Sequence, residues 1–158
     1  MTPQVTIITP TYNKPGYFAQ CADSVLAQKY KRWVWWPVIN SLEMIDQYTF
    51  PDDSRIVPVW FPATDAMRKQ FYVTARIINW IYPKVRTDYI YFLADDDLID
   101  PDGLGRLVDI MENHWSGDVC YGRCEVQDEQ PDGTFKTACW CFDGQDVGGS
   151  TGIEPDCR

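Results

Sequence analysis

The chain has 158 residues, which fits one domain, and 45% of them are hydrophobic, which is enough for a buried core. Its net charge of −9 argues against nucleic acid or an anionic membrane as the main partner. The N-terminal residues lack the charged and long apolar regions of a signal peptide, and no apolar run approaches the length of a membrane span. The composition therefore predicts a single cytoplasmic domain over residues 1–158, with reduced cysteines.

Strand and helix patterns alternate along most of the chain. Strands are predicted at 5–9, 33–39, 55–61 and 89–93, and helices at 18–26, 41–47, 67–82 and 104–115. Pro37 and Pro58 interrupt the second and third strands, and we expect a bulge or an edge position near Pro37. The alternation predicts an α/β fold, with a mostly parallel Rossmann-like sheet and helices on both faces.

The pattern changes after Trp115. Residues 119–126 and 134–142 indicate two strands, and the turn residues between them predict a β-hairpin. The hairpin would place Cys120 and Cys124 on one face of its first strand and Cys139 and Cys141 on one face of the second. Their spacing matches no familiar zinc motif, so half-buried thiols are favoured over a zinc site.

The strand at 89–93 leads directly into three consecutive carboxylates, Asp95, Asp96 and Asp97. In open α/β sheets, ligands bind at the edge where such strands end. Adjacent carboxylates repel one another, and a divalent cation with oxygen ligands would offset that repulsion. The alternative is an acidic helix start, for which a single aspartate would suffice. Three carboxylates at a strand end favour a metal site.

Three blocks of sequence resemble the family-2, GT-A-fold glycosyltransferases. They are Val5-Thr6-Ile7-Ile8-Thr9-Pro10-Thr11-Tyr12-Asn13-Lys14-Pro15, Ser24-Val25-Leu26-Ala27-Gln28 with Tyr30, and Phe92-Leu93-Ala94-Asp95-Asp96-Asp97-Leu98-Ile99-Asp100-Pro101-Asp102-Gly103-Leu104. The resemblance covers about residues 4 to 115 well, and the blocks occur in the family's order and spacing. It implies the inverting transfer of a sugar from a nucleoside diphosphate sugar to an acceptor hydroxyl, assisted by Mn²⁺ or Mg²⁺.

The same resemblance assigns roles to residues of the first and third blocks. Asp96 would be the main metal ligand, Asp97 an outer or alternative ligand, and Asp95 would reach the ribose. Pro10, Thr11 and Tyr12 would line the nucleotide pocket, with Tyr12 against the base.

Two residues that the resemblance places near the nucleotide have a simple structural interpretation as well, and the acceptor molecule is not defined. Tyr12 could instead be an ordinary packed aromatic. Arg76, which lies where the family often carries basic residues near the nucleotide, could instead be a solvated helix charge. The resemblance leaves the acceptor undefined, as a glycan, a lipid or a protein.

Two positions depart from the family's pattern. The family usually ends its second strand with a carboxylate pair, and here the residues are Ile39-Asn40-Ser41. Asn40 can still hydrogen-bond a base edge, whereas Ile39 cannot, so base preference is expected to be altered. Ala94 stands where many members have the first aspartate of an Asp-x-Asp-Asp run, and the remaining carboxylates preserve metal binding.

The base that deprotonates the acceptor lies late in the family's sequences. Glu154 and Asp156 are the late carboxylates near the start of the family's acceptor segment, although both are also typical of a surface loop. We therefore expect a chain that binds donor and lacks part of the acceptor region. The alternatives are an inactive nucleotide- or sugar-binding module and a structural domain that keeps only the fold.

Overall fold

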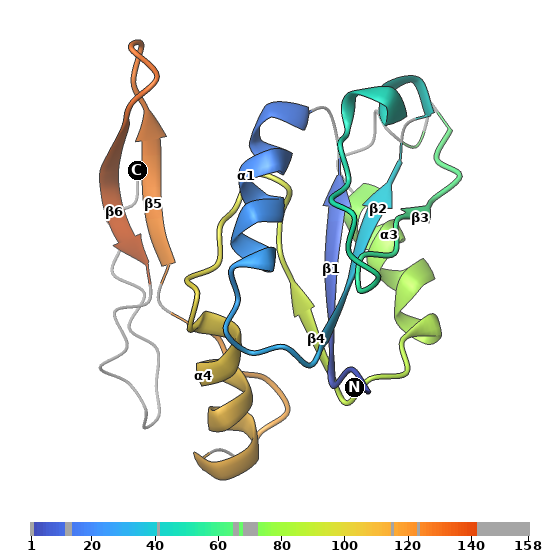
Figure 1. Ribbon diagram of the computed structural model, residues 1–158, viewed down its shortest axis with the longest axis vertical. Coiled ribbons are helices and arrows are strands. Elements are labelled where there is room, and N and C mark those ends of the chain that lie inside the picture. The colour runs from blue at the N-terminus through green and yellow to red at the C-terminus, as the bar shows by residue number, and fades with distance from the viewer. Residues whose placement is uncertain are drawn as a thin grey trace. The chain divides into compact units, whose positions relative to one another are not determined.

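The computed structural model describes residues 2–11, 14–40, 42–64, 67, 73–114, 116–122 and 124–141 (Figure 1). The chain divides into two compact units, residues 1–105 and residues 106–158. The first unit contains a parallel sheet with its flanking helices, and the second contains a β-hairpin. In the described part of the chain, no helix is both long and apolar enough to span a membrane.

Four parallel strands form the sheet of the first unit. They are β1 (Val5–Thr11), β2 (Trp33–Ile39), β3 (Val59–Trp60) and β4 (Tyr89–Phe92). Their order is β3-β2-β1-β4, so β1 lies between β2 and β4. The β-branched and aromatic residues of these strands suit a pleated, buried surface, which is why the sequence pattern located all four. The predicted parallel α/β sheet is confirmed.

Pro37 lies inside this sheet. β2 pairs with β1 along its whole length without a shift of register, and β3 flanks its other side. The expected bulge or edge position near Pro37 is therefore wrong. On the β3 side, β2 makes one isolated bridge from Trp35 to Ile56 and pairs again from Val38 to Val59. Pro37 falls between these two contacts, so its missing N–H leaves no ladder position unfilled.

Helices and helical turns connect the strands. They are α1 (Pro15–Leu26), η1 (Leu42–Gln47), α3 (Val73–Ile81), η2 (Tyr82–Lys84), α4 (Gly103–Asp109) and the π-helical η3 (Ile110–His114). Pro15 opens α1, where its missing N–H is tolerated, and Pro83 falls in the turn that ends α3. The predicted helix residues Trp115 and 68–72 lie outside the described part of the chain.

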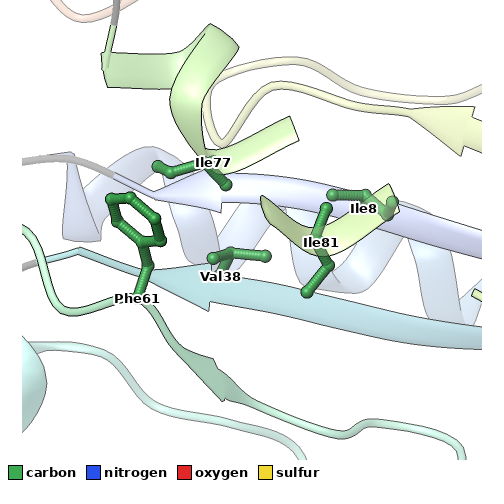
Figure 2. Close-up of a cluster of buried hydrophobic side chains, with 5 residues drawn as sticks. All are labelled: Ile8, Val38, Phe61, Ile77 and Ile81. Carbon is green, nitrogen blue, oxygen red and sulfur yellow. The ribbon is translucent and has the colours of Figure 1, made fainter. Parts of the chain in front are cut away.

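The sheet is covered on both faces. On one face, Ile8 and Val38 pack with Phe61 and with Ile77 and Ile81 of α3, and Figure 2 shows this cluster. Side chains alternate between faces along a strand, so the neighbours of Ile8 and Val38 in sequence point to the other face. There Phe18 of α1 stacks on Trp35, with ring centroids 5.4 Å apart. The predicted helices on both faces are therefore present.

In the second unit, β5 (Cys124–Glu129) pairs antiparallel with β6 (Phe135–Cys141), which confirms the predicted hairpin. Gly133 in the connecting turn has a φ of +79°, a conformation that favours glycine. β5 begins at Cys124, so Cys120 lies outside the strand and the expected shared face with Cys124 is wrong. Burial raises the pKa of the Cys120 thiol, whereas Cys124 is exposed. The side chains of Cys139 and Cys141 lie outside the description.

Candidate functional site

The first unit contains a cavity of about 350 Å³ at the carboxyl edge of the sheet. Its lining comes from the ends of β1, β2 and β4, from the turn after β4, and from α3. The lining residues are Pro10, Asn40, Thr74, Ile78, Phe92, Leu93, Ala94, Asp95 and Asp96. The carboxyl ends of parallel strands meet at one edge, so residues far apart in sequence come together here. Four of the predicted site residues, Pro10, Asn40, Asp95 and Asp96, share this cavity.

The end of β2 contributes a buried amide to the cavity. Asn40 is 1% exposed and follows Ile39, which is itself buried in the sheet. A carboxamide both donates and accepts hydrogen bonds, whereas the aliphatic side chain of Ile39 does neither. The structure therefore gives this wall of the cavity one neutral polar group, Asn40.

The carboxylates stand on a tight turn after β4. The Leu93 N–H donates to the Ile8 carbonyl at 3.1 Å, which keeps the segment beside β1 beyond the last strand residue. The Asp97 N–H then donates to the Ala94 carbonyl at 3.2 Å and closes the turn. Asp95 is 7% exposed, and Asp96 is the more open of the two carboxylates that line the cavity.

The third carboxylate, Asp97, does not line the cavity. Burial and the neighbouring Asp96 carboxylate raise the pKa of Asp97, and the Lys14 ammonium acts in the opposite direction. The repulsion between adjacent carboxylates that the sequence predicted is therefore present on this turn.

Lys14 forms an ion pair with Asp96, and this residue was not singled out from the sequence. The hydrogen bond to Asp96 raises the pKa of the Lys14 ammonium, with added attraction from Asp95. Lys14 immediately precedes α1, and Asp96 follows β4. Because β1 and β4 are adjacent and parallel, the segments that follow them reach the same edge of the sheet. The pair therefore depends on strand order, which the alternation of strands and helices along the sequence does not give.

Other predicted site residues lie elsewhere or outside the description. Thr11 is buried, and its hydroxyl donates to the Val38 carbonyl at 3.2 Å, so it links β1 to β2. Arg76 is exposed on α3 and is not part of the cavity lining. Tyr12, Glu154 and Asp156 lie outside the described residues. Thr74 and Ile78 of α3 line the cavity and were not predicted to do so.

The sequence model of the family described as "Glycosyl transferase family 2" matches residues 74–149 of this chain. The protein CgeD of Bacillus subtilis (strain 168) is 25% identical over 139 residues, a match that covers 80% of this chain and 30% of CgeD.

Solved structures resemble the fold. Residues 1–349 of TarS of S. aureus superpose with a TM-score of 0.55 and 16% identity, over 72% of this chain and 33% of that structure. The mannosyltransferase PcManGT of Pyrobaculum calidifontis gives a TM-score of 0.52 and 17% identity, over 72% of this chain and 34% of that one. The fold is therefore the parallel α/β sheet of the GT-A type. Together with the family match, it confirms the resemblance to family-2 glycosyltransferases. The match covers about a third of CgeD, of PcManGT and of TarS residues 1–349, and 20% of a second TarS structure.

Proposed function

We propose that this chain forms the donor-binding part of an inverting glycosyltransferase that uses a nucleoside diphosphate sugar and a divalent cation. The observation that carries the proposal is the shared cavity of Pro10, Asn40, Asp95 and Asp96 at the carboxyl edge of the sheet. Two similar structures support it by their ligands. PcManGT was solved in complex with GDP-Man and Mn²⁺, and TarS was solved in complex with UDP-GlcNAc.

The lining supplies groups suited to a nucleoside. Pro10 and Ile78 offer apolar surface, and Asn40 offers a buried amide that can pair with the edge of a base. The Asp95 carboxylate would accept hydrogen bonds from the ribose hydroxyls. Because Asn40 stands where the family usually has a carboxylate, base preference is expected to be weaker or different from that of relatives with the acidic pair.

The residues on the turn after β4 fit a divalent cation in part. Carboxylate oxygens are the donors that Mn²⁺ and Mg²⁺ prefer, and Asp96 would be the principal ligand with Asp97 next to it. The ion pair with Lys14 partly neutralises the Asp96 carboxylate, so a metal ion would have to share or displace that ammonium. Within the described residues, no group of three or more such ligands gathers, so phosphate oxygens and water would complete the coordination. When bound, the cation would neutralise charge that builds on the departing diphosphate.

The proposed reaction is a single displacement. The acceptor hydroxyl oxygen bonds to the anomeric carbon, the bond to the diphosphate oxygen breaks, and the hydroxyl proton passes to a carboxylate base. A base must lie within hydrogen-bond reach of that hydroxyl. Glu154 and Asp156 stay predictions for this role. The cytoplasmic location and the single domain over 1–158 also stay predictions, and the acceptor stays undefined.

Calorimetry with UDP, GDP, dTDP and CDP, each with Mn²⁺ and with EDTA, tests the proposal. We expect at least one nucleotide to bind, with tighter binding in Mn²⁺, and Asn40→Ala to weaken it or change the preferred base. Absence of binding by all four nucleotides would contradict the proposed function. A sharp preference for UDP that survives Asn40→Ala would contradict the role given to Asn40.

The amide at position 40 also favours a second function, that of a non-catalytic nucleotide- or sugar-binding module. Donor hydrolysis and transfer assays on residues 1–158 separate the two. Glu154→Gln and Asp156→Asn are the informative variants. Loss of transfer in one of them would identify the base, whereas binding without turnover in the parent chain would support the module.

A further inference from the structure

One stripe of α1 contacts both ends of the segment that carries the three carboxylates. The stripe consists of Cys21 and Ser24, which are three residues apart on one side of the helix, and of Gln28 just beyond its C-terminal end. Gln28 follows the last helical residue by two positions and is fully buried. Residues 94–104, the aspartate segment, run alongside this stripe.

The first contact lies at the start of the aspartate segment. The Cys21 thiol donates to the Ala94 carbonyl at 3.6 Å, the same carbonyl that accepts the Asp97 N–H. Burial, with nearby Asp95, raises the pKa of Cys21 to about 12, so the thiol keeps its proton and stays a donor at neutral pH. The carboxylate turn is therefore attached to α1 at its first residue.

The second contact lies just beyond the carboxylates. The Ser24 hydroxyl accepts the Ile99 N–H at 3.2 Å and donates to the Cys21 carbonyl at 2.7 Å. One side chain thus connects the helix backbone to the aspartate segment, and both polar functions of the hydroxyl are satisfied.

The third contact is the most extensive. The Gln28 amide nitrogen donates to the carbonyls of Ile99 at 3.2 Å and Asp100 at 2.8 Å, as well as to that of Ser24. Its amide oxygen accepts the Leu104 N–H at 3.1 Å, just inside the start of α4. A buried amide with both ends satisfied fixes its partners in direction as well as in distance.

We infer that Cys21, Ser24 and Gln28 are positioning residues that hold Asp95–Asp97 at the edge of the cavity. Their hydrogen bonds given above go to backbone on both sides of the carboxylates. These bonds restrain the backbone at both ends of the stretch that carries Asp95, Asp96 and Asp97, and the Lys14 ammonium pairs with the Asp96 carboxylate itself. This inference rests on the proposed function for its consequence, because the ligands held in place are those proposed for the cation.

The test uses Gln28→Leu, which keeps a similar side-chain volume and removes the amide that bonds to Ile99, Asp100 and Leu104. The control variant is Ile81→Ala, in the apolar cluster between α3 and the sheet. Ile81 is fully buried and does not line the cavity. Its aliphatic side chain packs in the apolar cluster and has no group that could hydrogen-bond to the aspartate segment. We expect Gln28→Leu to reduce the Mn²⁺-dependent gain in UDP affinity about tenfold, as for other residues that orient metal ligands. The UDP affinity measured in EDTA should change much less.

A second measurement separates failure of this inference from failure of the proposed function. Amide chemical shifts and hydrogen exchange of residues 95–97 need no ligand. The chemical shifts should change in Gln28→Leu and stay near the parent values in Ile81→Ala. Hydrogen exchange at 95–97 should exceed the rate set by global unfolding more in Gln28→Leu than in Ile81→Ala. Unchanged signals at 95–97 in Gln28→Leu would overturn the inference. An equal loss of the Mn²⁺-dependent gain in UDP affinity in Gln28→Leu and Ile81→Ala would also overturn it. A parent chain that binds no nucleotide, with changed signals at 95–97, would overturn only the function. Ser24→Ala provides a milder variant if Gln28→Leu fails to fold.

Discussion

The two helices that cover the sheet of the first unit contact it in different ways. α3 contributes Ile77 and Ile81 to an apolar cluster with Ile8 and Val38. α1 also buries apolar side chains, Phe18 among them, and in addition it bonds to the aspartate segment through polar side chains. Apolar contacts are non-directional and fix the distance between layers. Hydrogen bonds are directional, so the polar contacts on the α1 side can specify the path of a loop.

The first prediction removes an apolar contact between α3 and the sheet, and it has the largest expected effect. Ile81→Ala should lower the free energy of unfolding by about 3 kcal/mol, because it leaves a cavity in a well-packed cluster. Urea unfolding measures the change. Ile81→Val, with an expected loss of about 1 kcal/mol, serves if the alanine variant fails to fold.

The same variants sharpen the comparison when nucleotide binding is measured. At a temperature where the variant is folded, the ratio of UDP affinities in Mn²⁺ and in EDTA should match that of the parent chain. A change in that ratio comparable to the change in Gln28→Leu would show that packing on both faces of the sheet positions the carboxylates. The proposed difference between α1 and α3 would then be wrong.

The second prediction removes the proposed principal ligand of the cation. Asp96→Asn should remove most of the coupling between Mn²⁺ and UDP, a loss of about 2 kcal/mol, because the amide is a weaker cation ligand than the carboxylate. Asp102→Asn is the matched control, since Asp102 pairs with Lys29 at 2.8 Å and does not line the cavity. Equal UDP affinity in Mn²⁺ and EDTA for the parent chain would reject the metal.

The third prediction concerns the cation already beside Asp96. Lys14→Met should strengthen the binding of Mn²⁺ alone several-fold, because Lys14 competes for the same carboxylate and adds a positive charge nearby. Electron paramagnetic resonance of Mn²⁺ without nucleotide measures this affinity. Lys29→Met changes the net charge equally and should leave Mn²⁺ binding nearly unchanged. Unchanged or weaker Mn²⁺ binding in Lys14→Met would show that the two cations do not share Asp96.

Sequence periodicity and turn chemistry predicted the fold well and the site in part. The strands and α1 were found because their apolar residues recur at the spacing that burial requires. Pro37 was misplaced because a single sequence does not show where the neighbouring strand interrupts its pairing. Pro10, Asn40, Asp95 and Asp96 reach one cavity because all of them lie at or just beyond the carboxyl ends of parallel strands.

The contacts between distant segments were beyond sequence reasoning. Gln28 belongs to the second block that resembles the family, yet its bonds to Ile99, Asp100 and Leu104 depend on how α1 lies against the aspartate segment. The pairing of Lys14 with Asp96 depends on strand order in the same way. Spacing along the chain identifies which side chains carry chemistry, and tertiary packing decides which of them meet.

The last prediction concerns a charged contact, the ion pair between Arg55 and Asp53, and it has the smallest expected effect on stability. Arg55 donates to Asp53 at 3.0 and 2.6 Å and lies 3.7 Å from the centre of the Trp33 ring. These hydrogen bonds lower the pKa of Asp53 from 3.8 to about 2. A lowered carboxyl pKa stabilises the fold above the unfolded value of 3.8, and the stabilisation is lost as the pH falls toward about 2.

Asp53→Asn should therefore cost about 1 kcal/mol at neutral pH, after allowance for solvent screening of this partly exposed pair, and progressively less as the solution is acidified below 3.8. Unfolding free energies of the parent and the variant at about pH 7, 4.5 and 3 measure the trend. The cost of Ile81→Val, which involves no charge, should stay constant over the same range. A cost for Asp53→Asn that is independent of pH would show that the contact stabilises the loop through packing and hydrogen-bond geometry, as the uncharged contacts of α1 do, and not through the carboxylate's charge.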